Sequence, residues 1–111
     1  MQFGKRLRTA VGYDLTRTAD EIRSGYSFDV SCQGSVPESI ICFLDSDSFE
    51  GSVRLAISLG GDADTMACIT GAISEAYYGG VPESLELSVR NFLGPDLLEI
   101  LDQFRYRYCI R

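Results

Sequence analysis

Histidine is absent from this sequence, and its absence excludes several kinds of active site. Without an imidazole, neither a serine–histidine nor a cysteine–histidine nucleophile can form. A zinc site is also not expected, because the cysteines include no C-x-x-C pair and no histidine can assist them. We expect free, mostly buried thiols in a protein of the reducing cytoplasm. The cysteines are Cys32, Cys42, Cys68 and Cys109.

Long apolar runs and a surplus of positive charge are also missing. No apolar run approaches the roughly 18 residues of a membrane helix, and the first residues lack the apolar segment of a signal peptide. The net charge of −6, from 16 acidic and 10 basic residues, argues against a nucleic-acid-binding surface. A chain of 111 residues that is 45% hydrophobic is typical of one folded domain.

Glycine, proline and helix-capping residues divide the chain into short helical segments. Apolar residues recur with a period of about 3.6 and strand patterns are scarce, so we predict an all-α fold. At one helix start, Ser35 would be the cap, Pro37 would fit the first turn and Glu38 would complete a capping box. Residues 24–34, just before it, are predicted to form a loop. The predicted helices are 2–11, 14–23 with Asp14 or Thr16 as cap, 36–46, 48–59, 63–78, 82–94 and 95–107.

The most informative segment is residues 60–65, which read Gly-Gly-Asp-Ala-Asp-Thr at the start of a predicted helix. Its pattern places the carboxylates of Asp62 and Asp64 and the hydroxyl of Thr65 together at a helix N-terminus. Oxygen ligands of this kind suit Mg²⁺ or Mn²⁺ rather than zinc. A structural interpretation is favoured by the spacing alone: Asp62 caps the helix, and Asp64 interacts favourably with the helix dipole.

Two other acidic motifs do not fit this segment. An EF-hand loop needs a further oxygen ligand and a glycine where this chain has Met66 and Ala67. A phosphatase-type D-x-D-x-T motif has its threonine two residues after the second aspartate, whereas Thr65 follows Asp64 directly. Neither a calcium-binding EF-hand nor this phosphatase motif is therefore expected.

Residues 57–65, Ile-Ser-Leu-Gly-Gly-Asp-Ala-Asp-Thr, resemble the C-terminal signature of the ADP-ribosylglycohydrolase family, and residues 69–79 resemble its continuation. This family includes the dinitrogenase reductase-activating glycohydrolase and the ADP-ribosyl-acceptor hydrolases. Residues 28–38 and the segment Tyr13-Asp14-Leu15 are similar to it as well. The resemblance covers roughly residues 12–104.

The resemblance implies an all-α protein that holds two Mg²⁺ or Mn²⁺ ions in a central cleft. It also implies hydrolysis of the glycosidic bond that links ADP-ribose to a protein side chain or another acceptor. The positions that match the family's C-terminal metal ligands are Asp62, Asp64 and Thr65, and a carboxylate here would also accept a proton from the attacking water. Residues 31–36 match a segment near the substrate cleft. The candidate substrate-binding residues in it are Gln33, Gly34 and Ser35.

The predicted helix 63–78 has two further features. Its small residues recur on one face, and a glycine inside a helix costs about 1 kcal/mol relative to alanine, which the close approach of another helix would offset. Tyr77 and Tyr78 match aromatic residues of the family, although their spacing also fits a place in the core. The small residues are Ala63, Ala67 and Gly71.

The sequence departs from the family because it lacks the family's N-terminal metal-ligand motifs. Neither a Gly-Asp-x-x-Gly segment nor a Thr-Asp-Asp cluster occurs, and the chain contains no Asp-Asp pair. We therefore expect that the chain corresponds to the C-terminal part of the fold, binds a cation weakly and is inactive alone. A partner chain would supply the missing half. The alternative is a non-catalytic helical module that binds a nucleotide or another protein.

A partial fold would also leave apolar faces uncovered. Large exposed apolar patches are rare on soluble monomers, so we expect a homo-oligomer. We predict that two faces take part in it: the face with Ala63, Ala67 and Gly71, and the run formed by Ile40, Ile41, Phe43 and Leu44.

Overall fold

The all-α prediction is confirmed. The computed structural model describes residues 12–109, and this part of the chain contains six helices and no strand. The predicted helix 2–11 lies outside the described residues. The chain divides after Gly80 into an N-terminal unit, residues 1–80, and a C-terminal unit, residues 81–111. None of the described helices is long and apolar enough to cross a membrane.

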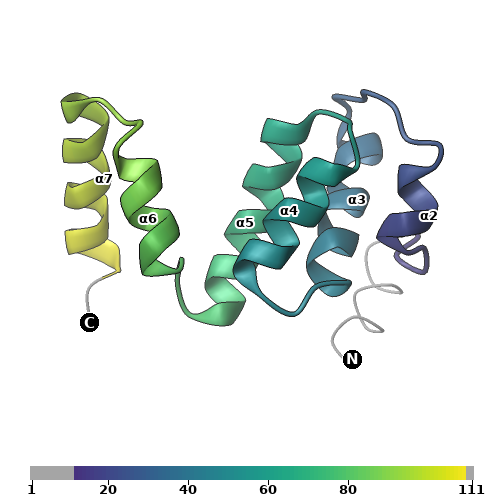
Figure 1. Cartoon of the computed structure of the whole chain (residues 1–111), viewed down its shortest axis with the longest axis horizontal. Coiled ribbons are helices and arrows are strands. Elements are labelled where there is room, and N and C mark those ends of the chain that lie inside the picture. The colour runs from purple at the N-terminus through teal and green to yellow at the C-terminus, as the bar shows by residue number, and fades with distance from the viewer. Residues whose placement is uncertain (1–11, 110–111) are drawn as a thin grey trace. The chain divides into compact units, whose positions relative to one another are not determined.

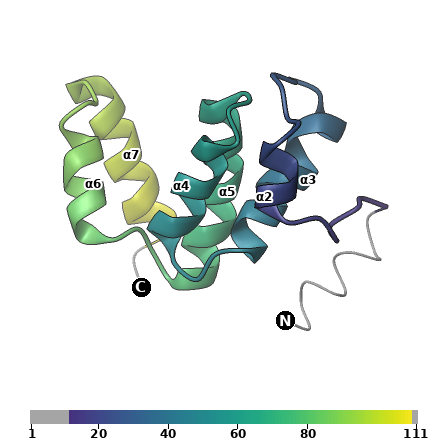
Figure 2. The ribbon, with the colours of Figure 1, turned by 45° about the vertical axis from the view of Figure 1, so that its right-hand side comes forward.

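The N-terminal unit contains four of the described helices around one apolar core. Helix α5 packs against both α3 and α4, and α2 packs against α3 (Figures 1 and 2). Leu15, Ile41 and Met66 lie at the centre of the core and are buried. The helices are α2 (Ala19–Arg23), α3 (Cys32–Leu44), α4 (Phe49–Ser58) and α5 (Ala63–Tyr78).

Helix α3 begins earlier than the sequence pattern predicted. The Ser31 hydroxyl accepts a hydrogen bond from the Gly34 backbone N–H at 3.1 Å, so Ser31 is the cap. The prediction of Ser35 as cap with Pro37 in the first turn is wrong, because Pro37 lies inside the helix. Ser31 is itself fixed by Asp29, whose carboxylate accepts from the Ser31 backbone N–H at 2.8 Å and from its hydroxyl at 2.7 Å.

Helix α2 begins later than predicted. Thr18 is its cap and forms a capping box with Glu21. The prediction of Asp14 or Thr16 as the cap is wrong. Asp14 instead accepts a hydrogen bond from the Thr16 backbone N–H at 3.0 Å, which stabilises a turn before the helix.

Both apolar faces predicted to take part in association make contacts within the N-terminal unit, although Ala63, Ala67 and Gly71 remain half-exposed. A Cβ placed on Gly71 would lie 3.7 Å from the Val53 side chain, so α4 approaches this face of α5 closely. This contact provides the close helix approach expected at the small-residue stripe. In the run at 40–44, Ile41 and Phe43 are buried, and the remaining apolar residues pack against the core. Ile41 and Phe43 are therefore unavailable to a partner chain, whereas association through the half-exposed face with Ala63, Ala67 and Gly71 stays a prediction.

The cysteines are unpaired, but most of them are exposed. Cys42 is buried, whereas the other three are exposed, so the expectation of mostly buried thiols is wrong. Burial raises the pKa of the Cys42 thiol to about 12. Cys42 therefore remains protonated at neutral pH and serves as a small apolar core residue.

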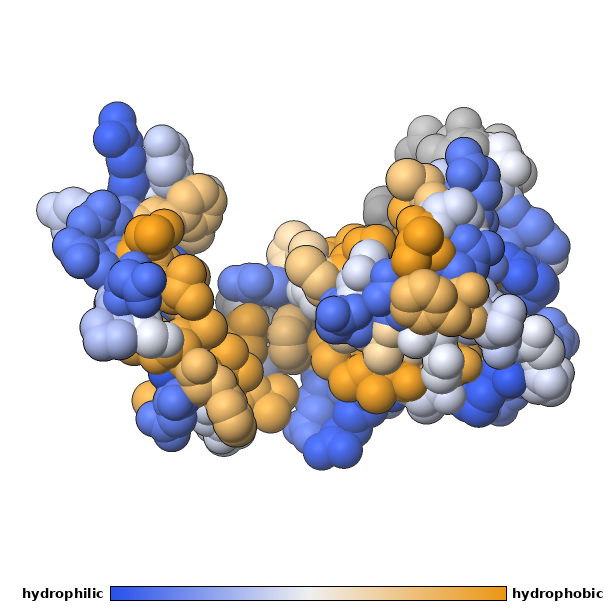
Figure 3. Space-filling model, turned by 90° about the horizontal axis from the view of Figure 1, so that it is seen from above, coloured by the Kyte–Doolittle hydropathy of each residue, from blue (hydrophilic) through white to orange (hydrophobic). Residues whose placement is uncertain are grey.

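The C-terminal unit consists of two helices, α6 (Glu83–Arg90) and α7 (Pro95–Tyr108). Helix α6 ends before the predicted Gly94, and no residue of either helix is buried. Arg90 donates to the Asp102 carboxylate of α7 at 2.6 Å. Large apolar side chains remain exposed, and Figure 3 shows them gathered on the surface of this unit, at the left. They are Leu87, Val89, Phe92, Leu97, Ile100, Phe104, Tyr106 and Tyr108.

Candidate metal-binding site at the start of helix α5

The site begins at a glycine turn between α4 and α5. Gly60 has a φ of 78°, a left-handed conformation that favours glycine. The residue before the turn, Leu59, is buried in the core and fixes the end of α4. Beyond the turn, α5 is fixed by Met66, which is fully buried, and by Thr70, whose hydroxyl donates to the Ser39 carbonyl at 2.8 Å. The turn therefore connects two well-anchored helices.

Asp62 and Asp64 bring two carboxyl groups together after this turn. Asp62 occupies the N-cap position, yet its side chain makes no capping hydrogen bond. A hydrogen bond with the Asp62 carboxyl group is the main reason why the pKa of Asp64 lies below its usual range. The Thr65 backbone N–H, which donates to Asp64 at 2.9 Å, lowers this pKa further. The start of α5 therefore holds two carboxyl groups within hydrogen-bonding reach.

This donor set fits an oxygen-coordinated cation. Two neighbouring carboxylates repel each other when both are ionised, and a divalent cation relieves that repulsion. Asp62 is half-buried, while Asp64 and Thr65 are exposed to solvent. Within residues 12–109, no group of three or more acidic, cysteine or histidine side chains is placed to hold a metal. Water or another polypeptide would therefore have to complete the coordination sphere, as is common for Mg²⁺.

The three candidate substrate-binding residues lie in the first turn of α3, with different surroundings. Gln33 has an exposed side chain. A Cβ on Gly34 would lie 2.0 Å from the Asp29 carboxylate, so any larger residue at this position would displace that group. Ser35 is buried, and its hydroxyl donates to the Ser31 carbonyl at 2.7 Å. Substrate binding by these residues stays a prediction, and Gln33 offers the most accessible side chain.

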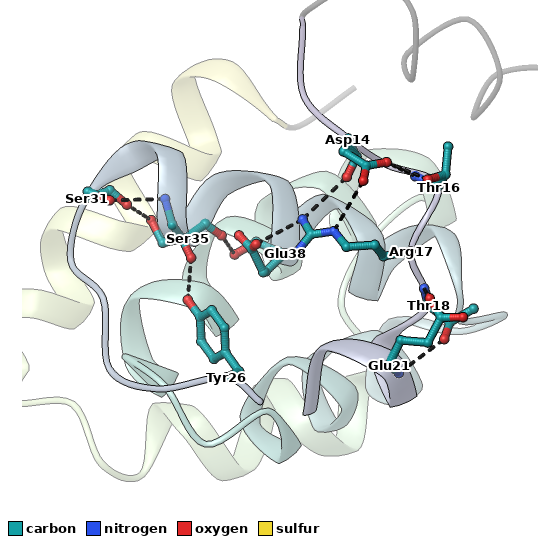
Figure 4. A network of polar contacts seen from close by, with 11 residues as sticks. Asp14, Thr16, Arg17, Thr18, Glu21, Tyr26, Ser31, Ser35 and Glu38 are labelled. Carbon is teal, nitrogen blue, oxygen red and sulfur yellow. Dashed lines mark hydrogen bonds and ion pairs between the residues drawn. The ribbon is translucent and has the colours of Figure 1, made fainter. Parts of the chain in front are cut away.

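Tyr26 connects the first turn of α3 to the glycine turn, and the sequence pattern gave it no role. Its hydroxyl donates to the Gly34 carbonyl, and Figure 4 shows the ring beside the segment that carries Ser31 and Ser35. A Cβ on Gly61 would lie 2.2 Å from the Tyr26 ring, so the ring lies against this glycine. Within the Gly60–Gly61 pair, only Gly60 has the left-handed conformation that favours glycine. The glycine at position 61 was therefore the sequence signal that another group packs closely there.

The electrostatics of Tyr26 reflect the same arrangement. Burial is the main reason why its pKa is raised, and the negative charges of Glu38, Asp29 and Asp62 raise it further. Tyr26 therefore stays protonated at neutral pH and remains a hydrogen-bond donor. Three acidic residues from different segments thus lie close enough to influence one phenol.

Glu38 is a buried carboxylate that the sequence pattern assigned to a capping box. That assignment is wrong, because its Oε1 accepts a hydrogen bond from Arg17 Nη2 at 3.0 Å (Figure 4). The Glu38 side chain is only 7% exposed, and its Oε2 has no hydrogen-bond partner among the described residues. Arg17 also donates to the Asp14 carbonyl at 3.3 Å. This ion pair fixes the segment before α2 against α3.

The two family-matching tyrosines lie at the other end of α5. Sixteen helical residues, Ala63 to Tyr78, extend about 24 Å, so Tyr77 and Tyr78 are distant from Asp62. The Tyr77 ring packs edge-on against Phe43 at 5.3 Å between centroids. The Tyr78 hydroxyl donates to the Ser46 carbonyl at 3.4 Å. Both tyrosines therefore have packing partners at the end of the helix opposite the candidate site.

Comparison with known proteins identifies the family. The sequence model described as ADP-ribosylglycohydrolase matches residues 1–108. The chain belongs to the ADP-ribosylglycohydrolase family. The match includes the glycine turn, the paired carboxylates and the first turn of α3.

Curated relatives support the assignment and show how much of a full-length protein is present. ADP-ribosylhydrolase ARH3 of Homo sapiens is 36% identical over 94 residues, which cover 73% of this chain and 26% of that protein. The Mus musculus protein of the same name is 37% identical over 92 residues, covering 71% of this chain and 25% of that protein. The chain thus spans about a quarter of the length of these relatives. No solved structure matches it significantly.

Proposed function

We propose that this chain supplies part of the cation and substrate site of an ADP-ribosylglycohydrolase. Asp62, Asp64 and Thr65 would hold Mg²⁺ or Mn²⁺, and the first turn of α3 would face an ADP-ribose-containing ligand. The observation that carries the proposal is the pair of carboxyl groups at the start of α5. Asp62 occupies the N-cap position but makes no capping hydrogen bond, so its carboxylate is available to a cation. The name of the ARH3 relatives supports an ADP-ribosyl substrate.

The residues of this chain have defined tasks in such a reaction. Asp62 and Asp64 provide negative charge for the cations, and Thr65 provides a neutral oxygen. A pair of hard cations held there would polarise the ribose hydroxyls and lower the pKa of a nearby water. A carboxylate at the start of α5 would accept the proton of the water as that water attacks the anomeric carbon. The glycosidic bond to the acceptor would break in the same reaction, and the acceptor would leave after taking up a proton. This chemistry needs neither histidine nor a cysteine nucleophile.

We further propose that the chain does not turn over substrate alone. The family's Gly-Asp-x-x-Gly and Thr-Asp-Asp motifs are absent, and two carboxylates leave most coordination positions to water. A polypeptide that carries those motifs would complete the site. The exposed apolar side chains of α6 and α7 support association with another chain, in the first instance an identical copy. The unpaired thiols favour a reducing cytoplasm.

Divalent-cation titration tests the metal site directly. Mn²⁺ binding can be measured from the loss of the electron paramagnetic resonance signal of free Mn²⁺. Binding is expected to be weak in the unmodified chain and weaker still in Asp62→Asn and Asp64→Asn. Asp96→Asn, which removes one exposed carboxylate from the C-terminal unit, is the matched control and should bind as the unmodified chain does. Equal binding by all four proteins would refute the assignment.

A hydrolase assay separates the catalytic proposal from its alternative. The chain alone should release no ADP-ribose from a modified protein, and co-expression with a polypeptide carrying the two missing motifs should restore magnesium-dependent release. The alternative is a non-catalytic helical module, which the lack of a three-ligand acidic group among the described residues favours. That alternative is correct if the chain binds neither cation nor complementing polypeptide.

A further inference from the structure

We propose that Tyr26 is a positioning residue for the carboxylates at the start of α5. Its ring and hydroxyl would hold the Gly60–Gly61 turn against the first turn of α3 and thereby set the affinity of Asp62 and Asp64 for a divalent cation. This inference rests on the proposed function, and it adds a residue from a different segment to the machinery of the site.

Backbone hydrogen bonds fix both ends of the glycine turn, from Gly60 N–H to the Ile57 carbonyl and from Met66 N–H to the Asp62 carbonyl, but the turn itself has no side chain to pack. Apart from its two chain neighbours, no residue has a heavy atom within 4 Å of the position where a Cβ on Gly60 would be. Gly61, by contrast, lies directly under the Tyr26 ring, whose nearest atoms would be 2.2 and 2.9 Å from a Cβ at that position. Two successive glycines have more conformational freedom than other residues. The Tyr26 ring therefore restricts the conformation of a turn whose glycines have no side chains to restrict it.

Tyr26 is suited to this task because it is fixed at both ends. Its ring is partly buried and packs against the apolar core of the N-terminal unit. Its hydroxyl donates to the Gly34 carbonyl, in a helix turn that is already held by the Ser31 cap. The Asp29 carboxylate lies over Gly34 and fixes Ser31. Movement of the ring would thus require movement of α3 or loss of the hydroxyl bond.

The consequence for the site follows from chain connectivity. Asp62 is bonded directly to Gly61, so the orientation of the Gly61 peptide sets the position of the Asp62 Cα and limits where its carboxylate can lie. Asp62 and Asp64 lie close enough to repel each other when ionised, so a loose turn would let them move apart. Groups that orient metal ligands are known to change metal affinity. Tyr26 therefore lowers the cost of bringing the two carboxylates to one cation.

The test compares two single-hydroxyl deletions in the full chain, with Mn²⁺ as the probe. Tyr26→Phe keeps the ring and removes the bond to Gly34, and it should raise the Kd for Mn²⁺ about threefold to tenfold, the equivalent of one net hydrogen bond. Tyr78→Phe removes a hydroxyl bond to a backbone carbonyl at the opposite end of α5 and should leave the Kd unchanged. Gly61→Ala, which displaces the ring, should raise the Kd more than Tyr26→Phe does.

The outcomes separate this inference from the proposed function. Thermal unfolding without metal should show comparable stability losses in Tyr26→Phe and Tyr78→Phe. If Tyr26 had a purely structural role, the two variants would also show equal changes in the Kd for Mn²⁺. Equal changes in Kd would therefore overturn the inference. If Asp62→Asn loses Mn²⁺ binding while Tyr26→Phe retains it in full, the metal site stands and the positioning role is wrong. If the unmodified chain binds no Mn²⁺, both proposals are wrong.

Discussion

The hydroxyl oxygens of Ser52 and Ser74 lie 2.6 Å apart in the buried contact between α4 and α5. Both serines are fully buried, and Ser52 also donates to the Phe49 carbonyl at 2.7 Å. Ser74 therefore donates to Ser52 in this geometry. Two small hydroxyl residues allow the two helices to approach closely, and the hydrogen bond makes the contact specific.

This pair leads to a double-mutant prediction. Ser52→Ala leaves the Ser74 hydroxyl without its acceptor and should lower the free energy of unfolding by about 1–3 kcal/mol. The double variant should lose roughly 1 kcal/mol less than the sum of the single variants, because both partners are then removed. Urea denaturation measures all three. The exposed Ser88→Ala is the control, and strict additivity would show that the two hydroxyls do not interact.

The Arg17–Glu38 pair should be sensitive to loss of either charge. Arg17→Met leaves the buried Glu38 carboxylate without its partner and should cost about 2–3 kcal/mol, less than a fully buried pair because the Arg17 side chain is 36% exposed. Replacing both residues, as Arg17→Met with Glu38→Leu, should recover part of that loss. Calorimetric unfolding measures the difference.

The surface pair Arg54–Glu50 provides the control for this experiment. Its nitrogen and oxygen lie 2.8 Å apart, but both side chains are largely exposed. Arg54→Met should therefore change the free energy of unfolding by less than about 1 kcal/mol. A similar effect of Arg54→Met and Arg17→Met would contradict the importance of burial.

Asp29 should make stability depend on pH in the acid range. Hydrogen bonds from the Ser31 hydroxyl and backbone N–H hold the pKa of Asp29 below its usual range. A lowered pKa in the folded state means that the stabilisation is complete above the unfolded pKa of about 3.9 and is lost as the pH falls through the folded pKa. The stability difference between the unmodified chain and Asp29→Asn should therefore be constant at neutral pH and shrink below about pH 4.

Carboxyl NMR titration gives a direct check on the cause. Ser31→Ala removes the hydrogen bond from the Ser31 hydroxyl, which lowers the Asp29 pKa more than the bond from the backbone N–H does. The Asp29 pKa should therefore rise towards its usual value in this variant. A lowered pKa that persists in Ser31→Ala would mean that another group is responsible.

The exposed apolar face of α7 predicts self-association. Leu97, Ile100 and Phe104 are spaced on one side of the helix and are each more than half exposed. We expect sedimentation equilibrium to give a dimer or a larger oligomer at micromolar concentration. Ile100→Glu should shift the equilibrium to monomer, because a carboxylate buried in an apolar contact is unfavourable. Gln103→Lys, at an exposed polar position of the same helix, is the control. A stable monomer of the unmodified chain would contradict the prediction.

Local sequence signals predicted α5 correctly, and its boundaries show why. The pair Gly60–Gly61 lies just before this helix, and Gly79, with a φ of 81°, ends it. Residues next to each end of the helix therefore indicate both of its boundaries. The start of α3 was missed because Ser31 and Ser35 are both good caps. The choice between them depends on Asp29 and on the pairing of Glu38 with Arg17, which are tertiary contacts.

The candidate site shows the same limit. The type and order of Asp62, Asp64 and Thr65 were sufficient to suggest a cation, because the ligands lie within one turn. Tyr26 was not found, because its contacts with Gly34 and Gly61 exist only after α3 and α5 have packed together. A pattern confined to neighbouring residues carries no information about such a contact.

The absence of buried residues in α6 and α7 has a consequence for how the chain unfolds. Regions with few buried apolar contacts open locally at a much lower free energy than the core. Amide protons of residues 83–108 should therefore exchange with solvent long before those of α5, whose Met66, Thr70 and Ser74 are fully buried. A protease given brief access to the folded chain would remove this hairpin first, cutting near Gly80 and leaving the glycine turn and its carboxylates on a shorter, still folded polypeptide.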